Sequence, residues 1–221
     1  MRGDVLIIED YHIKAAKGIV QHLIGDIKST KRRYIITIGG ESGSGKSEMG
    51  KAIQDELEAA GIKAVILGQD DYFVLPPRSN DLKRRENSKW LGPHVEVKMK
   101  NLEKNIINAL KGVKTIKKPL IDYEKNEILE EIVDLEGVGV LIAEGTYTSL
   151  LRNVDRRIFI DRNFEDTLAH RRKRERGEEV GDPFIERILE TEHKIIAGHK
   201  HLADILITKD YGVVFQERLI K

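Results

Sequence analysis

A glycine-rich octapeptide carries the clearest chemical signal in this chain: Gly40-Glu41-Ser42-Gly43-Ser44-Gly45-Lys46-Ser47. It fits the phosphate-binding pattern G-x-x-x-x-G-K-[ST] at every fixed position. Glycines in such a loop let backbone N–H groups turn inward around a polyphosphate. Lys46 would reach the β- and γ-phosphates, and the Ser47 hydroxyl would ligate Mg²⁺. The octapeptide therefore predicts a nucleotide site, the alternative being a glycine-rich turn that only caps a helix.

Acidic residues follow two later apolar runs. Asp70 and Asp71 come soon after residues 63–67, and Glu144 comes directly after residues 138–143. Carboxylates at the carboxyl ends of strands lie where open α/β sheets place their ligands. One aspartate could act as a base or a magnesium partner, although Asp is also common in caps and turns. Glu144 would be the second half of a nucleoside triphosphate site, ordering Mg²⁺ directly or through water.

A basic run contains Arg171, Arg172 and Arg174 at the end of a helix that we expect to begin near Phe164. Phosphoryl transfer spreads negative charge over the γ-phosphate oxygens, and a supplied arginine can contribute a factor of about 10³–10⁵ in rate. Residues 171–182 would make a suitable closing lid. The alternative is a charged, solvated helix end.

Strands and helices alternate in an order that would bring these groups together. Five apolar runs have the character of buried strands, and amphipathic or charged helices separate most of them. This alternation predicts an α/β three-layer sandwich around a mainly parallel five-stranded sheet. A further edge strand at 213–215 is an option. The five runs are residues 34–38, 63–67, 138–143, 157–161 and 203–208.

Two segments stand apart from this alternation. Residues 1–33 carry a helical apolar stripe and would form an N-terminal extension packed outside a nucleotide-binding domain at 34–221. Residues 74–97 are polar and irregular, and we expect them to form a substrate flap. Trp90, the only tryptophan, would either anchor that flap or stack on a ligand.

Composition limits the class of protein. The 221 residues are 34% charged and 40% hydrophobic, with a formal net charge of +1 and no cysteine. Cysteine chemistry is excluded, there is no global case for nucleic acid binding, and no apolar run approaches the roughly 20 residues of a membrane span. We expect a cytoplasmic enzyme without a membrane partner, and the sequence leaves a homo-oligomer open.

With these pieces in order, the chain resembles the uridine kinase and phosphoribulokinase family of P-loop kinases over about residues 34–208. The resemblance implies a small-molecule kinase that uses ATP and Mg²⁺. It implies that Asp70 takes the proton from the substrate hydroxyl near Mg²⁺ and that Glu144 is the acidic magnesium partner. Tyr72 and Tyr123 would line the acceptor pocket, and the arginines would belong to a lid. The more specific matches are residues 69–73, 119–123, 144–147, 166–174 and 202–207.

The acceptor side departs from that family. Uridine kinases usually carry an aromatic-Asp-His-Pro stretch in the flap, whereas residues 90–94 read Trp-Leu-Gly-Pro-His and lack the aspartate. Ile121 replaces a family tyrosine, and residues 124–126 lack a family histidine. The first expectation is a uridine or cytidine kinase. The alternatives are a kinase for a sugar phosphate or another non-nucleoside alcohol, and a nucleotide-binding regulatory module without transfer.

Overall fold

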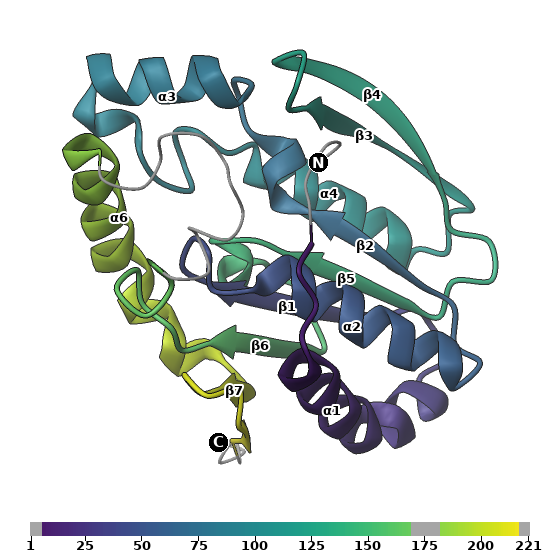
Figure 1. Ribbon diagram of the computed structural model, residues 1–221. Helices are drawn as coiled ribbons and strands as arrows, with labels where there is room; N and C mark the ends of the chain where they lie inside the picture. Colours follow the sequence, from purple (N-terminus) through teal and green to yellow (C-terminus); the bar gives the residue numbers. More distant parts are fainter. Residues whose placement is uncertain (1–5, 169–181, 217–221) are drawn as a thin grey trace.

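A six-stranded sheet forms the centre of the computed structural model, which describes residues 6–168 and 182–216 (Figure 1). Its strand order is β2-β5-β1-β6-β7-β8. The first five strands pair in parallel and β8 pairs antiparallel to β7, so the predicted five-stranded parallel sheet is confirmed with one edge strand added. The strands are β1 (Tyr34–Gly40), β2 (Ala64–Gly68), β5 (Val140–Glu144), β6 (Arg156–Ile160), β7 (Ile205–Ile207) and β8 (Val213–Phe215).

Helices cover both faces of this sheet. On one face, α1 (Asp10–Ser29) and α2 (Lys46–Ala59) pack against each other and share one hydrophobic core with the sheet. On the other face, α4 (Met99–Leu110) joins a second core. Helix α1 is an integral part of its layer, since Ile19 and Leu23 are fully buried there. The arrangement is the expected three-layer sandwich, and it leaves the carboxyl ends of the parallel strands along one edge.

The stretch at 74–97 differs from the expected irregular flap, because it contains helix α3 (Pro77–Glu86) and a 3-10 turn η2 (Ser88–Trp90). Helix α3 has only one large apolar residue, Leu82, which is 61% exposed. It therefore lacks the apolar stripe by which a helix is found in a sequence. Proline at its first position suits a helix start.

Buried Glu96 holds this segment together. Its carboxylate accepts hydrogen bonds from the Arg84 guanidinium, the Asn80 amide and the Gly92 backbone N–H. Trp90 donates from Nε1 to Asn80 Oδ1 at 2.7 Å, so Trp90 belongs to the same network. A buried carboxylate needs such partners, and here they fix α3 to the chain that follows it.

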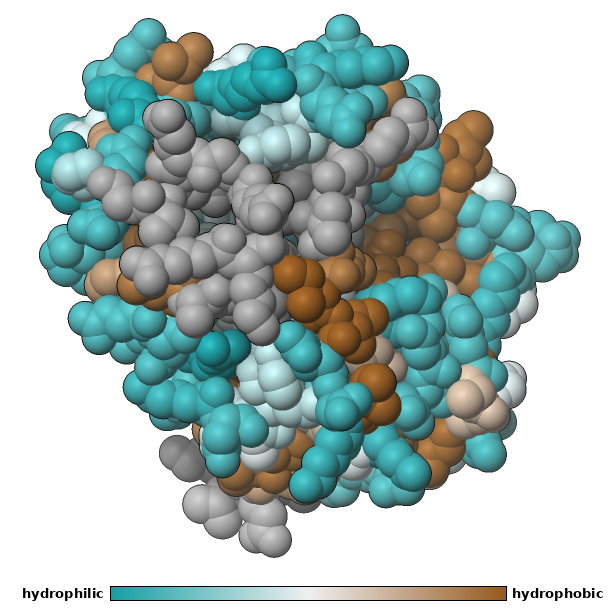
Figure 2. All heavy atoms as spheres, viewed as in Figure 1, coloured by the Kyte–Doolittle hydropathy of each residue, from teal (hydrophilic) through white to brown (hydrophobic). Residues whose placement is uncertain are grey.

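A separate antiparallel hairpin is formed by β3 (Thr115–Asp122) and β4 (Glu127–Asp134). The last long helix, α6 (Pro183–Ile196), leads through η5 (Ala197–Leu202) into β7. The face seen in Figure 2 is mainly hydrophilic where it is described. Within the described ranges, no helix combines the length and apolarity needed to cross a bilayer.

Candidate active site

The phosphate-binding loop joins the end of β1 to the start of α2. Gly43 and Gly45 have φ values of 76° and 94°, in the left-handed region that favours glycine. A Cβ atom at Gly45 would also lie 2.4 Å from the Tyr211 hydroxyl. Lys46 Nζ donates to the Glu41 carbonyl oxygen at 2.8 Å, which closes the loop on itself. Glycine at Gly45 therefore meets both the backbone conformation and the close approach of Tyr211.

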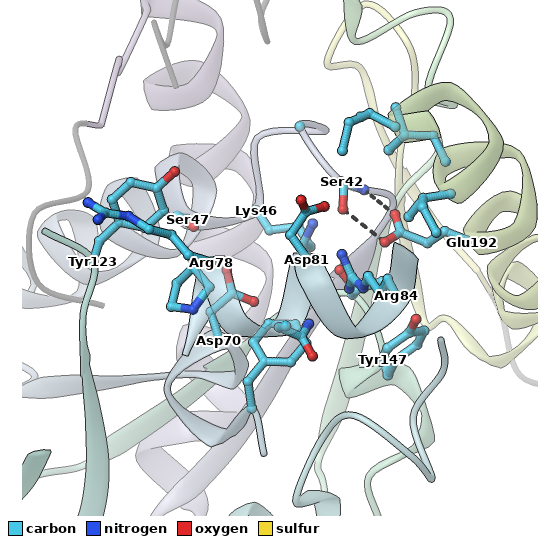
Figure 3. Close-up of a pocket in the computed structure, with 18 of the residues that line it drawn as sticks. Ser42, Lys46, Ser47, Asp70, Arg78, Asp81, Arg84, Tyr123, Tyr147 and Glu192 are labelled. Atoms are coloured by element: carbon cyan, nitrogen blue, oxygen red, sulfur yellow. Dashed lines mark hydrogen bonds between the residues drawn. The ribbon is translucent and has the colours of Figure 1, made fainter. Parts of the chain in front are cut away.

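A cavity of about 610 Å³ opens beside the loop (Figure 3). The lining comes from the loop, from residues that follow β2 and β5, from α3 and α6, and from the start of the β3–β4 turn. The volume suits a small molecule. Its polar lining includes Ser42, Lys46, Ser47, Asp70, Arg78, Asp81, Arg84, Tyr123, Glu144 and Glu192.

Ser47 and Glu144 both line this cavity and contact each other. Ser47 Oγ donates to Glu144 Oε2 at 3.2 Å. The parallel register places Ile38 of β1 and Gly68 of β2 on either side of Glu144, at the end of β5. Burial, followed by the charge of Asp70, raises the pKa of Glu144 to about 7.

The chemistry of these groups fits Mg²⁺. A hydroxyl and carboxylates are hard oxygen ligands, and Mg²⁺ is usually held by one or two carboxylates together with substrate phosphates. Ser47, Glu144 and Asp70 all line the cavity, and the charge of Asp70 acts on Glu144. The described residues contain no cluster of three His, Cys, Asp or Glu side chains suited to a metal. Mg²⁺ bound here would also take oxygens of phosphate and water as ligands.

The two adjacent aspartates have different surroundings. Asp70, in the 3-10 turn η1 (Gln69–Tyr72), lines the cavity. Asp71 is buried, and its carboxylate accepts from Lys118 Nζ at 2.6 Å and from the Ile121 backbone N–H at 3.0 Å. The structure thus leaves Asp70 as the candidate base and gives Asp71 a role in holding β3 to η1.

The aromatic residues that were expected to contact the substrate also differ in their surroundings. Tyr123 lines the cavity. Tyr72 is fully buried, and its hydroxyl accepts from Asn105 Nδ2 at 2.8 Å; burial raises the pKa of this phenol to about 12. Tyr72 is therefore a core residue, and its neighbour Phe73 lines the cavity instead. Trp90 does not line the cavity and anchors the flap. The proposed lid residues Arg171, Arg172 and Arg174 lie outside the described residues.

Several cavity residues escaped the sequence analysis. Asp81 and Arg84 lie three apart on α3, so they share a helix face and point to one side. That spacing could have been noticed only if α3 had been predicted. Glu192 comes from α6 and reaches the loop across 150 positions of sequence, for which there was no local signal.

The pKa of Glu144 leads to a stability prediction. Its ordinary value is 4.5 and its folded value is about 7, so between these pH values the folded protein keeps a proton that the unfolded chain releases. The stabilising contribution is complete below pH 4.5 and is lost as pH rises to about 7. Glu144→Gln has no carboxyl group at this position to titrate, so it should not lose stability in this way as pH rises. Thermal unfolding of the ligand-free proteins should show the variant gaining on the wild type between pH 5 and pH 8, and a difference in Tm that is independent of pH would contradict the assignment.

Comparisons with known proteins agree with the geometry. The model of the phosphoribulokinase / uridine kinase family matches residues 35–208. A bifunctional alpha-galactosidase/sucrose kinase of Mediterraneibacter gnavus is 28% identical over 200 residues, which cover 86% of this chain but only 21% of that protein. A uridine kinase of Bacillus cytotoxicus is 29% identical over 188 residues, covering 80% of this chain and 86% of that one.

Solved structures show the same fold. A putative fructose transport system kinase from Silicibacter sp. aligns with a TM-score of 0.63 at 19% identity, covering 87% of this chain and 98% of that chain. At this identity the likeness concerns architecture alone. It supports the α/β arrangement with a mainly parallel sheet.

Proposed function

The chain belongs to the phosphoribulokinase / uridine kinase family of P-loop kinases, which makes it a small-molecule kinase, and we propose that it transfers the γ-phosphoryl group of ATP to a hydroxyl of a small metabolite. The observation that carries this proposal is the position of Asp70. Its carboxylate lines the same cavity as Lys46 and Ser47. A base beside the phosphate-binding groups is what transfer to an alcohol requires, whereas nucleotide binding alone would not need it.

The proposed reaction assigns a role to each group. The oxygen of the acceptor hydroxyl attacks the γ-phosphorus while Asp70 accepts the proton of that hydroxyl. The bond between the γ-phosphorus and the bridging oxygen breaks, and ADP leaves with that oxygen. Lys46 stabilises the charge on the β- and γ-phosphates. Ser47 and Glu144 would hold Mg²⁺, which when bound neutralises developing phosphate charge. Lid arginines at 171, 172 and 174 would add to this neutralisation.

The acceptor is the open part of the proposal. A nucleoside such as uridine or cytidine is the first candidate, supported by the uridine kinases among the relatives. A sugar or another non-nucleoside alcohol is the second. In its favour, Asp81 and Arg84 line the cavity together with Phe73 and Tyr123. Carboxylates and guanidinium groups beside aromatic rings suit a molecule with several hydroxyls, and one relative is in part a sucrose kinase.

Phosphoryl transfer from ATP across a metabolite library, read by mass spectrometry, tests the proposal. Nucleosides, sugars and sugar phosphates should form separate arms, with a thermal-shift panel run alongside. We expect one class to gain the mass of a phosphoryl group and to stabilise the protein. Stoichiometric ATP binding with no transfer to any compound would instead support the third reading, a nucleotide-dependent regulator.

Removing the Ser47 hydroxyl should weaken the use of Mg²⁺. Ser47→Ala deletes one proposed ligand, and we expect the Mg²⁺ concentration for half-maximal activity to rise about tenfold or more, as metal-site partners commonly show. Ser47→Thr, which the loop pattern permits, should keep near-normal Mg²⁺ dependence. Titration of activity against Mg²⁺ at fixed ATP measures both variants, and unchanged half-points in both would remove Ser47 from the metal site.

A further inference from the structure

Helix α6 contacts the phosphate-binding loop through two adjacent residues. Ser42 donates to the Glu192 carboxylate twice, from its backbone N–H at 2.8 Å and from Oγ at 2.9 Å (Figure 3). His193 places Nδ1 at 2.6 Å from Oε1 of Glu41. Two neighbouring loop residues are therefore joined to two neighbouring helix residues.

The two carboxylates in these contacts are buried, whereas the side chain of His193 is 41% exposed. The side chain of Glu41 is 6% exposed, and Glu192 is 5% exposed. Burial raises the pKa of Glu192. A carboxylate that has lost its hydration depends on the hydrogen bonds that remain, so displacement of α6 from the loop would leave both carboxylates poorly satisfied.

Glu41 also holds the chain that follows β6. Its Oε2 accepts from the Phe164 backbone N–H at 2.8 Å, and the Phe164 ring meets the His193 ring edge to face at 6.0 Å between centroids. The phosphate-binding pattern accepts any residue type at the position of Glu41, because the loop binds phosphates through backbone N–H groups and through Lys46. The Glu41 carboxylate is therefore available for a different task.

That task concerns the wall of the cavity. Helix α6 contributes Ile185, Ile188 and Leu189 to the lining. We infer that Glu41 is a positioning residue that couples nucleotide binding at the loop to the placement of α6 along the wall of the cavity. The inference rests on the proposed function only in requiring that the loop bind nucleotide. By linkage, an acceptor that stabilises α6 would also strengthen nucleotide binding.

Hydrogen exchange of the full chain with and without MgADP tests this coupling. In the wild type, MgADP should slow exchange at the start of α2, which reports binding, and should slow exchange along α6 about tenfold. In Glu41→Ala, the α2 protection should persist while the α6 protection falls to less than about twofold. Glu190→Ala, an exposed change on the same helix, should behave as the wild type.

The outcomes separate a positioning role from a structural one. General destabilisation would speed exchange everywhere but would leave the MgADP-induced difference in α6 intact, and equal α6 protection in the wild type and Glu41→Ala would overturn the inference. If Glu41→Ala does not fold, Glu41→Gln keeps the acceptor for Phe164 and removes the charge beside His193, with the same expected loss. Absence of α2 protection in the wild type would refute nucleotide binding itself, whereas α2 protection without α6 protection would refute only the coupling.

Discussion

Asp70→Asn should reduce phosphoryl transfer by about 10²–10⁴-fold while MgADP binding survives. The substitution keeps the size of the side chain and its place in η1, but the amide cannot accept the proton of the acceptor hydroxyl. Asp70 lines the cavity beside Lys46 and Ser47, so the loss should fall on the chemical step. Steady-state and single-turnover rates against the identified acceptor measure it, with nucleotide affinity from calorimetry.

Asp71→Asn is the matched control, one residue away and with the same chemical change. Asp71 is buried against Lys118 and does not line the cavity. This variant should lose thermal stability and keep most of its turnover at temperatures where it remains folded. Full activity of Asp70→Asn would remove Asp70 as the base. Equal kinetic losses in both variants would mean that the effect comes from η1 as a whole.

Of the single substitutions proposed for this protein, Lys118→Met should lower the free energy of unfolding most. Lys118 is 5% exposed, and its ammonium lies 2.6 Å from the Asp71 carboxylate and 2.9 Å from that of Glu131. Removing it takes the ammonium partner away from the buried Asp71 carboxylate, which still accepts from the Ile121 backbone N–H. Breaking a buried pair in this way typically costs about 3–5 kcal/mol, which for a chain of this size lowers Tm by about 6–20 °C.

A matched change on the same strand isolates the burial effect. Lys117 pairs with Glu130 but is 63% exposed, so Lys117→Met should change stability by about 1 kcal/mol or less. The double variant Asp71→Asn/Lys118→Met should recover much of the loss, because no buried charge is left uncompensated. Urea unfolding of the wild type, the two lysine variants and the double variant measures these differences. Equal losses for the two lysine variants would contradict the role given to the buried pair.

The same pair matters for the site, because it joins the hairpin to η1. Asp71 follows Asp70, and Lys118 lies on β3, whose carboxyl end leads to Tyr123. Weakening this pair should therefore loosen two walls of the cavity together. In the surviving folded fraction of Lys118→Met, we expect a raised KM for the acceptor, with the KM for ATP less affected.

The sequence by itself determined the phosphate-binding loop, the strand before it, the helix after it and the parallel sheet. These features are local: β-branched runs, a glycine loop and a helical apolar stripe occupy neighbouring positions, and the strand alternation leaves few topologies. Glu144 was found in the same way, as the residue that ends an apolar run. The exposed helix α3 was missed because it buries no apolar stripe.

Only the tertiary structure decided which groups share the cavity. Residue type and position after the strand did not separate Asp70 from Asp71, and only the family resemblance favoured Asp70. In the structure Asp71 is distinguished by its contact with Lys118, which lies 47 positions away. Tyr72 lies in the core, where its hydroxyl accepts a hydrogen bond from Asn105. Glu192 contacts Ser42, although the two residues are 150 positions apart in the sequence. A side chain takes its role from the partners that satisfy its charge and hydrogen bonds once it is buried, and those partners are brought together only by the packing of distant elements.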